Sequence, residues 1–282
     1  MKLGFSACNF PHRNLAENIR YAGAEGFDFV EAHGQPFAMS LLSAPDYGRK
    51  TAALLRREGV EMTVHHALPD PCKEEACAAF RTQMQALHAF AAESPETVIL
   101  SFDTWVDRTA SLPQLLFALQ RFSDLPIAVL TEDFPLNSRD LALWQAAAAY
   151  PRYGLLCDVG HMNVRLCDTG NQPIWCLYNE GENLPLPAGD NTPQAFAFAL
   201  AKKPLPIRQL HLHNNDGTKD DHRALSDGTA DYAAIAAELK KLGFDGYADL
   251  ELSPTIHGVT GAAADAQLLA DRDLWRTLWD RA

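Results

Sequence analysis

The chain has 282 residues, which is enough for one large α/β domain or two smaller ones. Hydrophobic residues make up 47% of it and charged residues 21%, an ordinary globular composition that can bury a core. The 36 acidic residues outnumber the 24 lysines and arginines and give a formal net charge of −12. We therefore expect no nucleic-acid partner, because affinity for phosphate backbones comes largely from Lys and Arg.

Cysteine usage and hydropathy predict a cytoplasmic protein. The six cysteines are scattered without a C-x-x-C pair, so a reduced compartment is the simpler expectation. The N-terminal segment MKLGFSACNF lacks the apolar run of a signal peptide, and no stretch approaches about 18 consecutive apolar residues. We therefore expect no membrane partner.

Short apolar segments alternate with longer helical patterns along the chain. Strands are predicted at Lys2–Ala7, Phe27–Ala32, Glu61–His65, Thr97–Asp103, Ile127–Glu132, Tyr153–Asp158, Ile207–His213 and Tyr247–Glu251. Helices are predicted at Asn14–Gly26, Pro45–Gly59, Glu74–Ala92, Leu112–Phe122, Leu141–Ala149, Thr192–Lys202, Ala230–Leu242 and Ala262–Asp280. Repeated Gly and Pro between Met162 and Asp190 predict a long loop, of a length that is often a lid or a binding loop.

Eight strand–helix units without an obvious linker predict an α/β fold, a single (β/α)8 TIM barrel. The predicted domain covers residues 1–282, with the long loop inserted at about 162–190. The alternative is a doubly wound open sheet. Neither G-x-G-x-x-G nor G-x-x-x-x-G-K-[ST] follows an early strand, so the nucleotide-binding forms of that sheet lose support.

Polar residues stand at the ends of the last four predicted strands, where barrel enzymes carry their chemistry. These residues are Glu132, Asp158, His213 and Glu251. If the faces that carry them point inward, all four converge at the barrel mouth, where three carboxylates would repel one another without a cation. Histidine and carboxylate together suit a divalent ion such as Zn²⁺ or Mn²⁺. The pattern therefore predicts a metal site.

The stretch Leu210–Gly228, LHLHNNDGTKDDHRALSDG, adds further ligand-type residues. His211 and His213 have strand spacing and point to one face, and Asp220 and His222 repeat that spacing. The alternative reading is a polar, solvated loop after a strand.

The second half of the chain resembles the xylose isomerase-like TIM barrels, which include sugar isomerases and epimerases and the endonuclease IV type of DNA-repair enzyme. The motifs that carry the resemblance are LTED around Glu132, CDVGH at Cys157–His161, HLHNND at His211–Asp216, DDHRALSDG at Asp220–Gly228 and DLEL at Asp249–Leu252.

The resemblance implies specific ligands. In the ketose epimerase branch a Glu, an Asp, a His and a Glu hold one metal, which implies one divalent ion (Mn, Co, Zn or Mg) on Glu132, Asp158, His213 and Glu251. Glu132 and Glu251 are then the implied catalytic acid/base pair. In the endonuclease IV branch a separate zinc uses the His of D-x-x-H and a D-x-H pair, which implies that a second metal could bind three further residues. These are His161, Asp220 and His222.

A third zinc site of that branch needs a histidine after the fourth strand, where this chain has Ser101, so the trinuclear set is incomplete.

Three residues are expected to bind substrate: His65 through a sugar hydroxyl, His161 unless it holds the second metal, and Trp105 as an apolar wall against the ring. Glu31 could orient His65.

Together these implications favour a divalent-metal-dependent isomerase or epimerase that acts on a sugar or keto-polyol through an enediolate intermediate. The alternatives are a keto-sugar dehydratase or lyase with the same metal site, an endonuclease IV-like metallohydrolase and a non-catalytic sugar-binding barrel. The expected partner is a small sugar or polyol, slightly favoured to be unphosphorylated because no convincing phosphate clamp is present. A homo-oligomer is compatible with the resemblance.

Overall fold

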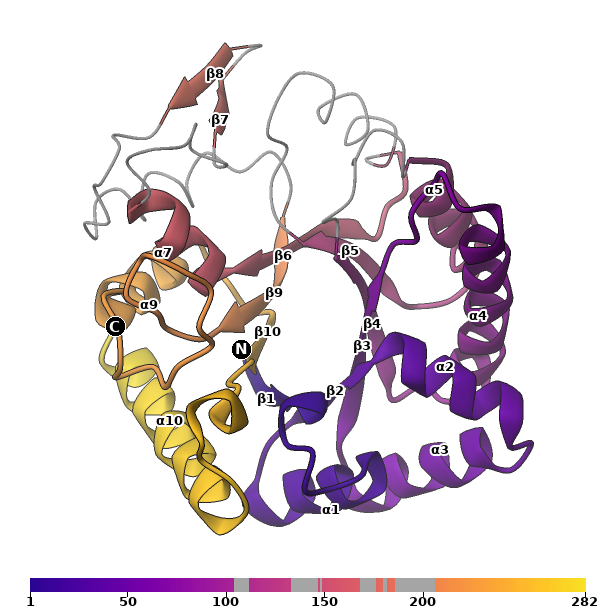
Figure 1. Cartoon of the computed structure of the whole chain (residues 1–282), viewed down its shortest axis with the longest axis horizontal. Coiled ribbons are helices and arrows are strands. Elements are labelled where there is room, and N and C mark those ends of the chain that lie inside the picture. Colours follow the sequence, from indigo (N-terminus) through magenta and orange to yellow (C-terminus); the bar gives the residue numbers. More distant parts are fainter. Residues whose placement is uncertain (104–111, 133–146, 148, 168–175, 180–181, 186–205) are drawn as a thin grey trace. The chain divides into compact units, whose positions relative to one another are not determined.

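A computed structural model describes residues 1–103, 112–132, 147, 149–167, 176–179, 182–185 and 206–282 (Figure 1). Eight parallel strands form a closed barrel in the order β1-β10-β9-β6-β5-β4-β3-β2. The strands are β1 (Lys2–Ser6), β2 (Phe29–His33), β3 (Glu61–Ala67), β4 (Thr97–Asp103), β5 (Ala128–Glu132), β6 (Tyr153–Asp158), β9 (Ile207–Leu212) and β10 (Tyr247–Leu250). The predicted (β/α)8 fold class is confirmed.

The described helices follow or separate these strands. They are α1 (Leu15–Glu25), α2 (Gly34–Ser43), α3 (Tyr47–Glu58), α4 (Glu74–Glu93), α5 (Leu112–Arg121), α7 (Val159–Cys167), α9 (Tyr232–Lys241) and α10 (Ala262–Arg281), with short 3-10 helices η1 (Ala7–Asn9) and η2 (Pro254–His257). None of the helices in the described residues is long and apolar enough to cross a membrane.

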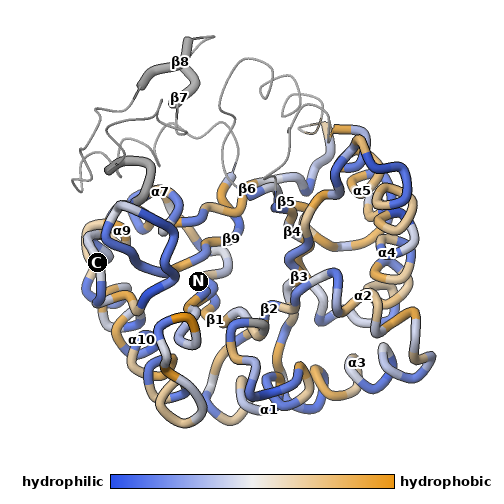
Figure 2. Tube along the Cα trace, in the orientation of Figure 1, coloured by the Kyte–Doolittle hydropathy of each residue, from blue (hydrophilic) through white to orange (hydrophobic). Residues whose placement is uncertain are grey.

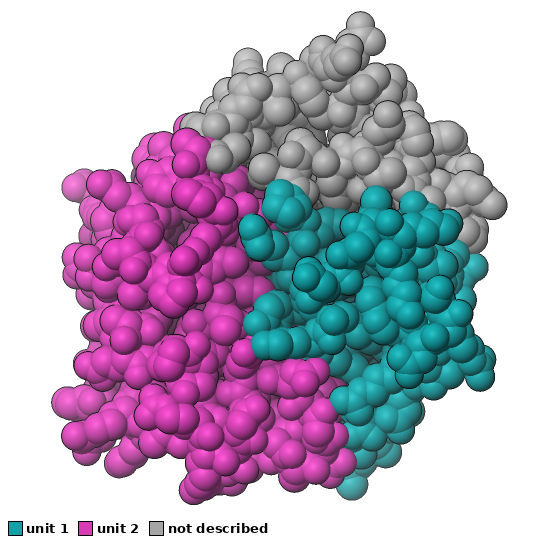
Figure 3. All heavy atoms as spheres, turned by 180° about the vertical axis from the view of Figure 1, so that it is seen from behind, with its two compact units in different colours: residues 1–12, 134–138, 157–282 teal, residues 13–133, 139–156 magenta. Residues whose placement is uncertain are grey.

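The chain divides into two compact units (Figure 3). Unit 1 comprises residues 1–12, 134–138 and 157–282, and unit 2 comprises residues 13–133 and 139–156. That the whole chain forms one domain stays a prediction.

In unit 2, strands β2 to β5 pair in parallel, with α1, α3, α4 and α5 on their outer side (Figure 1). The register places Glu31 beside Thr63 and His65 beside Ser101, so polar side chains gather on one face of neighbouring strands. Large apolar side chains fill the core; the fully buried ones are Phe29, Phe80, Phe102, Ile19, Leu55, Met62 and Met84.

Helix α2 was not predicted from the sequence. Its first residues, Gly34 and Pro36, are typical of a loop, but Pro is tolerated in the first turn of a helix, where no internal N–H bond is lost. Gly34 is required by packing, because an added Cβ would lie 2.6 Å from the Cβ of His66.

In unit 1, β1, β10 and β9 pair in parallel, and α9 and α10 pack against each other. Asp231 caps α9 by accepting a hydrogen bond from the backbone N–H of Ala234 at 3.0 Å. Trp275 of α10 is fully buried and contacts the Tyr232 ring edge-on, with 6.0 Å between ring centroids. The segment between β9 and α9 is a hydrophilic run (Figure 2).

The predicted loop from Met162 to Asp190 was wrong at two places. Helix α7 continues to Cys167, and β7 (Cys176–Asn179) pairs antiparallel with β8 (Glu182–Pro185). The remainder of that loop, and the predicted helices at 141–149 and 192–202, lie outside the described residues apart from residues 147 and 149.

Asp271 of α10 is a buried carboxylate, 2% exposed, that accepts a hydrogen bond from the backbone N–H of Leu225 at 3.0 Å. Burial raises its pKa to about 7 from the ordinary 3.8. The carboxyl group of Asp271 therefore binds its proton more tightly in the folded protein than in the unfolded chain. This tighter binding stabilises the folded state fully when the pH is below the pKa of the unfolded chain, and the stabilisation is lost as the pH rises through the folded pKa.

We predict that wild type loses roughly 2 kcal/mol of unfolding free energy relative to Asp271→Asn between about pH 5 and pH 8, because Asn cannot ionise. Urea denaturation of both proteins at each pH measures this difference. A difference that does not change with pH would show that Asp271 titrates near its ordinary pKa.

Candidate metal centre

Three of the four ligands predicted for the first metal come together in unit 1. Asp158 is the last residue of β6, His213 directly follows β9 and Glu251 directly follows β10. Their ligand atoms all lie within 4.8 Å of one another, and His213 Nε2 is 3.0 Å from Asp158 Oδ1. Asp158 and His213 are fully buried. Parallel strands thus deliver their C-terminal side chains to one point, as the barrel predicts.

Glu132, the fourth predicted ligand, ends β5 in unit 2, where its Oε2 lies 3.5 Å from His65 Nε2. His65 Nδ1 also forms a 3.0 Å hydrogen bond with Ser101, the serine that stands where the endonuclease branch needs a histidine. Asp103, for which no role is predicted from the sequence, offers a ligand atom within 4.8 Å of those of His65 and Glu132. The complete four-ligand set stays a prediction.

Of the other residues predicted for the site in unit 2, the structure describes Glu31 and His65. Glu31 accepts a 3.3 Å hydrogen bond from Thr63, and its carboxylate lies within 4.8 Å of a ring nitrogen of His65. Trp105 lies outside the described residues. The substrate-binding roles of His65 and Trp105 therefore stay predictions.

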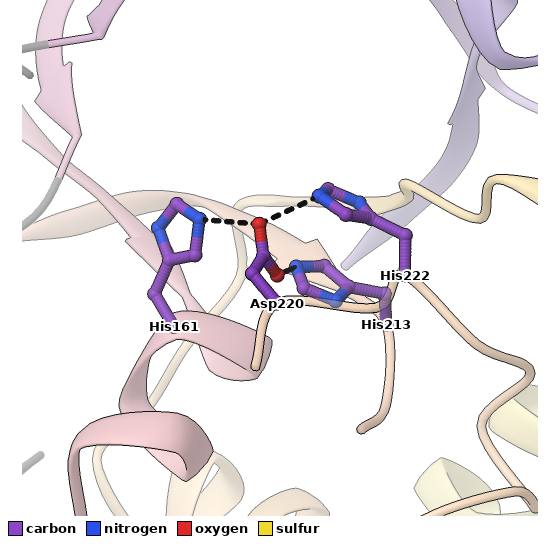
Figure 4. Close-up of side chains that lie close together, drawn as sticks. All are labelled: His161, His213, Asp220 and His222. Carbon is purple, nitrogen blue, oxygen red and sulfur yellow. Dashed lines mark hydrogen bonds and ion pairs between the residues drawn. The ribbon is translucent and has the colours of Figure 1, made fainter. Parts of the chain in front are cut away.

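A second group in unit 1 contains the three residues predicted for a second metal, together with His213 (Figure 4). Asp220 Oδ2 lies 3.2 Å from His161 Nε2 and 3.0 Å from His222 Nε2, and Asp220 Oδ1 lies 3.6 Å from His213 Nε2. Ligand bonds of about 2.05 Å around a tetrahedral zinc ion give ligand–ligand separations of about 3.3 Å. The spacing therefore fits such an ion.

His222 has a strained backbone. Its φ of +47° is the one positive value among non-glycine residues of the described chain. Such a conformation persists only where the surroundings enforce it, and it is common at functional sites. His222 Nδ1 donates a 2.8 Å hydrogen bond to the carbonyl of Glu251, which leaves Nε2 directed at Asp220.

The electrostatics of both groups favour a cation. Burial acts to raise the pKa of Asp158, but His161, His213 and His211 hold it well below its usual value. Burial likewise opposes ionisation of Glu251, yet His211 and His222 lower its pKa to about 2.

His222 responds in the opposite sense. Burial acts to lower its pKa, but the charges of Glu251, Asp220 and Asp158 raise it to about 10. The carboxylates are therefore held in the ionised form by the neighbouring histidines, and a divalent ion bound to the same residues would supply that positive charge in place of the histidine protons. The donor set fits such an ion.

The two groups share His213. One imidazole nitrogen coordinates one ion, and His213 Nε2 lies nearer to Asp158 than to Asp220. If two ions bind, His161, Asp220 and His222 would hold the second without His213.

Two buried residues beside the first group, His211 and Asp249, are not among the four predicted ligands. His211 Nδ1 lies 2.9 Å from Glu251 Oε2 and 3.8 Å from Asp158 Oδ2, and His211 Nε2 lies 3.9 Å from Asp249. The signal was present, because alternation places His211 with His213 and Asp249 with Glu251 on the same strand faces.

Short contacts position helix α7 and its His161. Asp158 Oδ1 accepts a 2.7 Å hydrogen bond from the backbone N–H of His161, in the manner of a helix cap. Asn215 donates to the carbonyl of Gly160 at 2.8 Å. Gly160 leaves room for the neighbouring imidazole, because an added Cβ would lie 1.9 Å from His213 Cε1.

We predict that Gly160→Ala displaces the His213 ring and weakens Zn²⁺ binding by about 10- to 100-fold, as loss of a metal site's supporting contacts typically does. Competition with a chromophoric chelator measures the affinity. Gly48→Ala in α3 is the control for the same change outside the site, because its new Cβ would lie 3.0 Å from Leu41 Cδ2 and 3.2 Å from Phe90 Cδ2 and meets no ligand-type residue. Equal affinities for wild type and Gly160→Ala would contradict the predicted position of His213.

Comparisons with known proteins agree with this fold. The model of the xylose isomerase-like TIM barrel family matches residues 137–272. No curated protein matches the chain.

Among solved structures, D-psicose 3-epimerase with D-tagatose, from Clostridium cellulolyticum H10, is 13% identical with a TM-score of 0.64, and the match covers 99% of each chain. The 3-keto-D-glucoside 4-epimerase from E. coli is 16% identical with a TM-score of 0.64, covering 98% of this chain and 99% of that one. A probable 3-DHS dehydratase from Bacillus anthracis is 15% identical with a TM-score of 0.64, covering 97% and 98%.

These matches confirm the predicted resemblance to the xylose isomerase-like TIM barrel superfamily. The similar structures include sugar epimerases and a dehydratase.

Proposed function

We propose that this protein is a divalent-metal-dependent isomerase or epimerase that acts on a sugar or keto-polyol through an enediolate intermediate. The observation that carries the proposal is the Asp158, His213 and Glu251 group at the C-terminal ends of three barrel strands. The epimerase names of two similar structures support a sugar as the substrate class.

A divalent ion held by these residues would polarise the sugar carbonyl and acidify the neighbouring C–H bond. Glu251 is the proposed base, since an ionised carboxylate beside the substrate can accept that proton. Its two oxygens allow one to serve as ligand and the other as base. His211, 2.9 Å from Glu251 Oε2, orients the carboxylate.

Glu132 is the proposed partner that returns the proton. Return to the opposite face of the same carbon gives an epimer, and return to the neighbouring carbon gives an isomer. Loss of a β-hydroxyl after the same first step gives a dehydration, which the likeness to a dehydratase keeps as the second candidate.

A metallohydrolase that cuts phosphodiesters is a third candidate, favoured by the convergence of His161, Asp220 and His222. The net charge of −12 opposes it, because DNA binding depends on basic residues. Cleavage or low-salt binding of an abasic-site duplex would support the hydrolase.

Hydrogen exchange with solvent tests the proposed chemistry. Protein loaded with Mn²⁺, Co²⁺, Zn²⁺ or Mg²⁺ is incubated in D₂O with a panel of ketoses and 3-keto-glycosides, and products are followed by NMR. The expected result is deuterium on the carbon beside the carbonyl in an epimer or isomer, or a dehydrated product with exchange. Sugar binding without exchange would identify a non-catalytic barrel and overturn the proposal.

We predict that Glu251→Gln lowers this exchange rate by at least about 100-fold with the fold retained, because the amide cannot accept the proton. Circular dichroism and the D₂O assay check both parts. Glu238→Gln on α9, where Glu238 pairs with Lys241, is the control for the same chemical change outside the site. A wild-type rate in Glu251→Gln would exclude Glu251 as the base.

A further inference from the structure

The segment that carries Asp220 and His222 is tied to the two C-terminal helices at two buried points. The Tyr232 hydroxyl of α9 donates a 2.6 Å hydrogen bond to the backbone carbonyl of His213. The Asp271 carboxylate of α10 accepts a 3.0 Å hydrogen bond from the backbone N–H of Leu225. Both side chains are nearly inaccessible, at 3% and 2% exposure. These bonds bracket the segment before and after its ligand-type residues.

Asn214 joins the start of this segment to its end through hydrogen bonds. Its backbone N–H and carbonyl pair with Arg223 at 3.0 and 2.8 Å, and its side-chain amide donates to the carbonyl of Leu225 at 2.8 Å. Leu225 is therefore bonded through both its carbonyl and its N–H. It lies three residues after His222, whose left-handed backbone needs an external constraint.

The buried position of Asp271 is unfavourable for the stability of the fold. Its Oδ2 has no hydrogen-bond partner among the residues that the structure describes, and a buried carboxylate without a cationic partner is unfavourable. An apolar side chain of similar size would remove that cost. What such a side chain could not supply is the acceptor for the Leu225 N–H.

We propose that Asp271 is a positioning residue for the metal-binding segment. By fixing Leu225 it holds His222 in the backbone conformation that directs its imidazole to Asp220. This inference rests on the proposed metal site and adds a residue from a helix outside it.

The test compares Asp271→Leu, which removes the acceptor, with Asp271→Asn, which keeps one. Zn²⁺ affinity is measured by chelator competition, and amide hydrogen exchange is measured on the metal-free proteins. We expect Zn²⁺ binding about 10- to 100-fold weaker in Asp271→Leu and within about threefold of wild type in Asp271→Asn. The amides around His222 and Leu225 should exchange faster in the Leu variant, while those of β9 and β10 keep their wild-type rates.

Asp273→Leu is the control on the same helix, since the Asp273 side chain is 64% exposed and pairs with Arg272 at the surface. If Asp271→Leu does not fold, Asp271→Ser, whose shorter side chain cannot reach Leu225, replaces it. Wild-type affinity and wild-type exchange at Leu225 in these variants would overturn the inference. A wild-type protein that binds no Zn²⁺ would instead overturn the proposed metal site.

Discussion

The buried carboxylate of Asp158 is the group on which the arrangement of the site depends. One oxygen accepts the first-turn N–H of α7 at His161 and lies 3.0 Å from His213, and the other lies 3.8 Å from His211. A carboxylate with no solvent exposure is tolerated only with such partners. The same carboxylate thus caps α7 and contacts the imidazoles of His211 on β9 and His213 just after it, which brings strand ends and the start of a helix to one point.

Strand ends were the part of the site that the sequence could predict. Period-two alternation and the barrel rule suffice to place Asp158 and Glu251 at the C-terminal ends of their strands, and Asp158 does end β6 while Glu251 directly follows β10. Alternation alone cannot separate His211 from His213, because both share a face; their different depth follows from the tertiary fold. The roles of Gly160 and Tyr232 depend on contacts with distant residues, which local patterns do not report.

The helices likewise differ in how far local sequence predicts them. Apolar strands and capped helices were predictable, since Asn14 and Gly26 mark the ends of α1 by residue type. Helix α2 was not, because Gly34 and Pro36 are residue types that usually interrupt helices, and the need for glycine at position 34 comes from the close approach of His66. Residue type therefore predicts secondary structure where it reflects the local backbone conformation, as at the ends of α1. It misleads where it reflects packing against a side chain distant in the sequence, as at Gly34.

Metal binding is the central claim, and metal content is its most direct test. Protein purified without chelators or added metal is analysed by inductively coupled plasma mass spectrometry. We expect about one equivalent of Mn, Co, Zn or Mg per chain, or about two if His161, Asp220 and His222 hold their own ion. A chain that contains no metal as purified, and takes up none on soaking, would contradict a metal-dependent isomerase or epimerase.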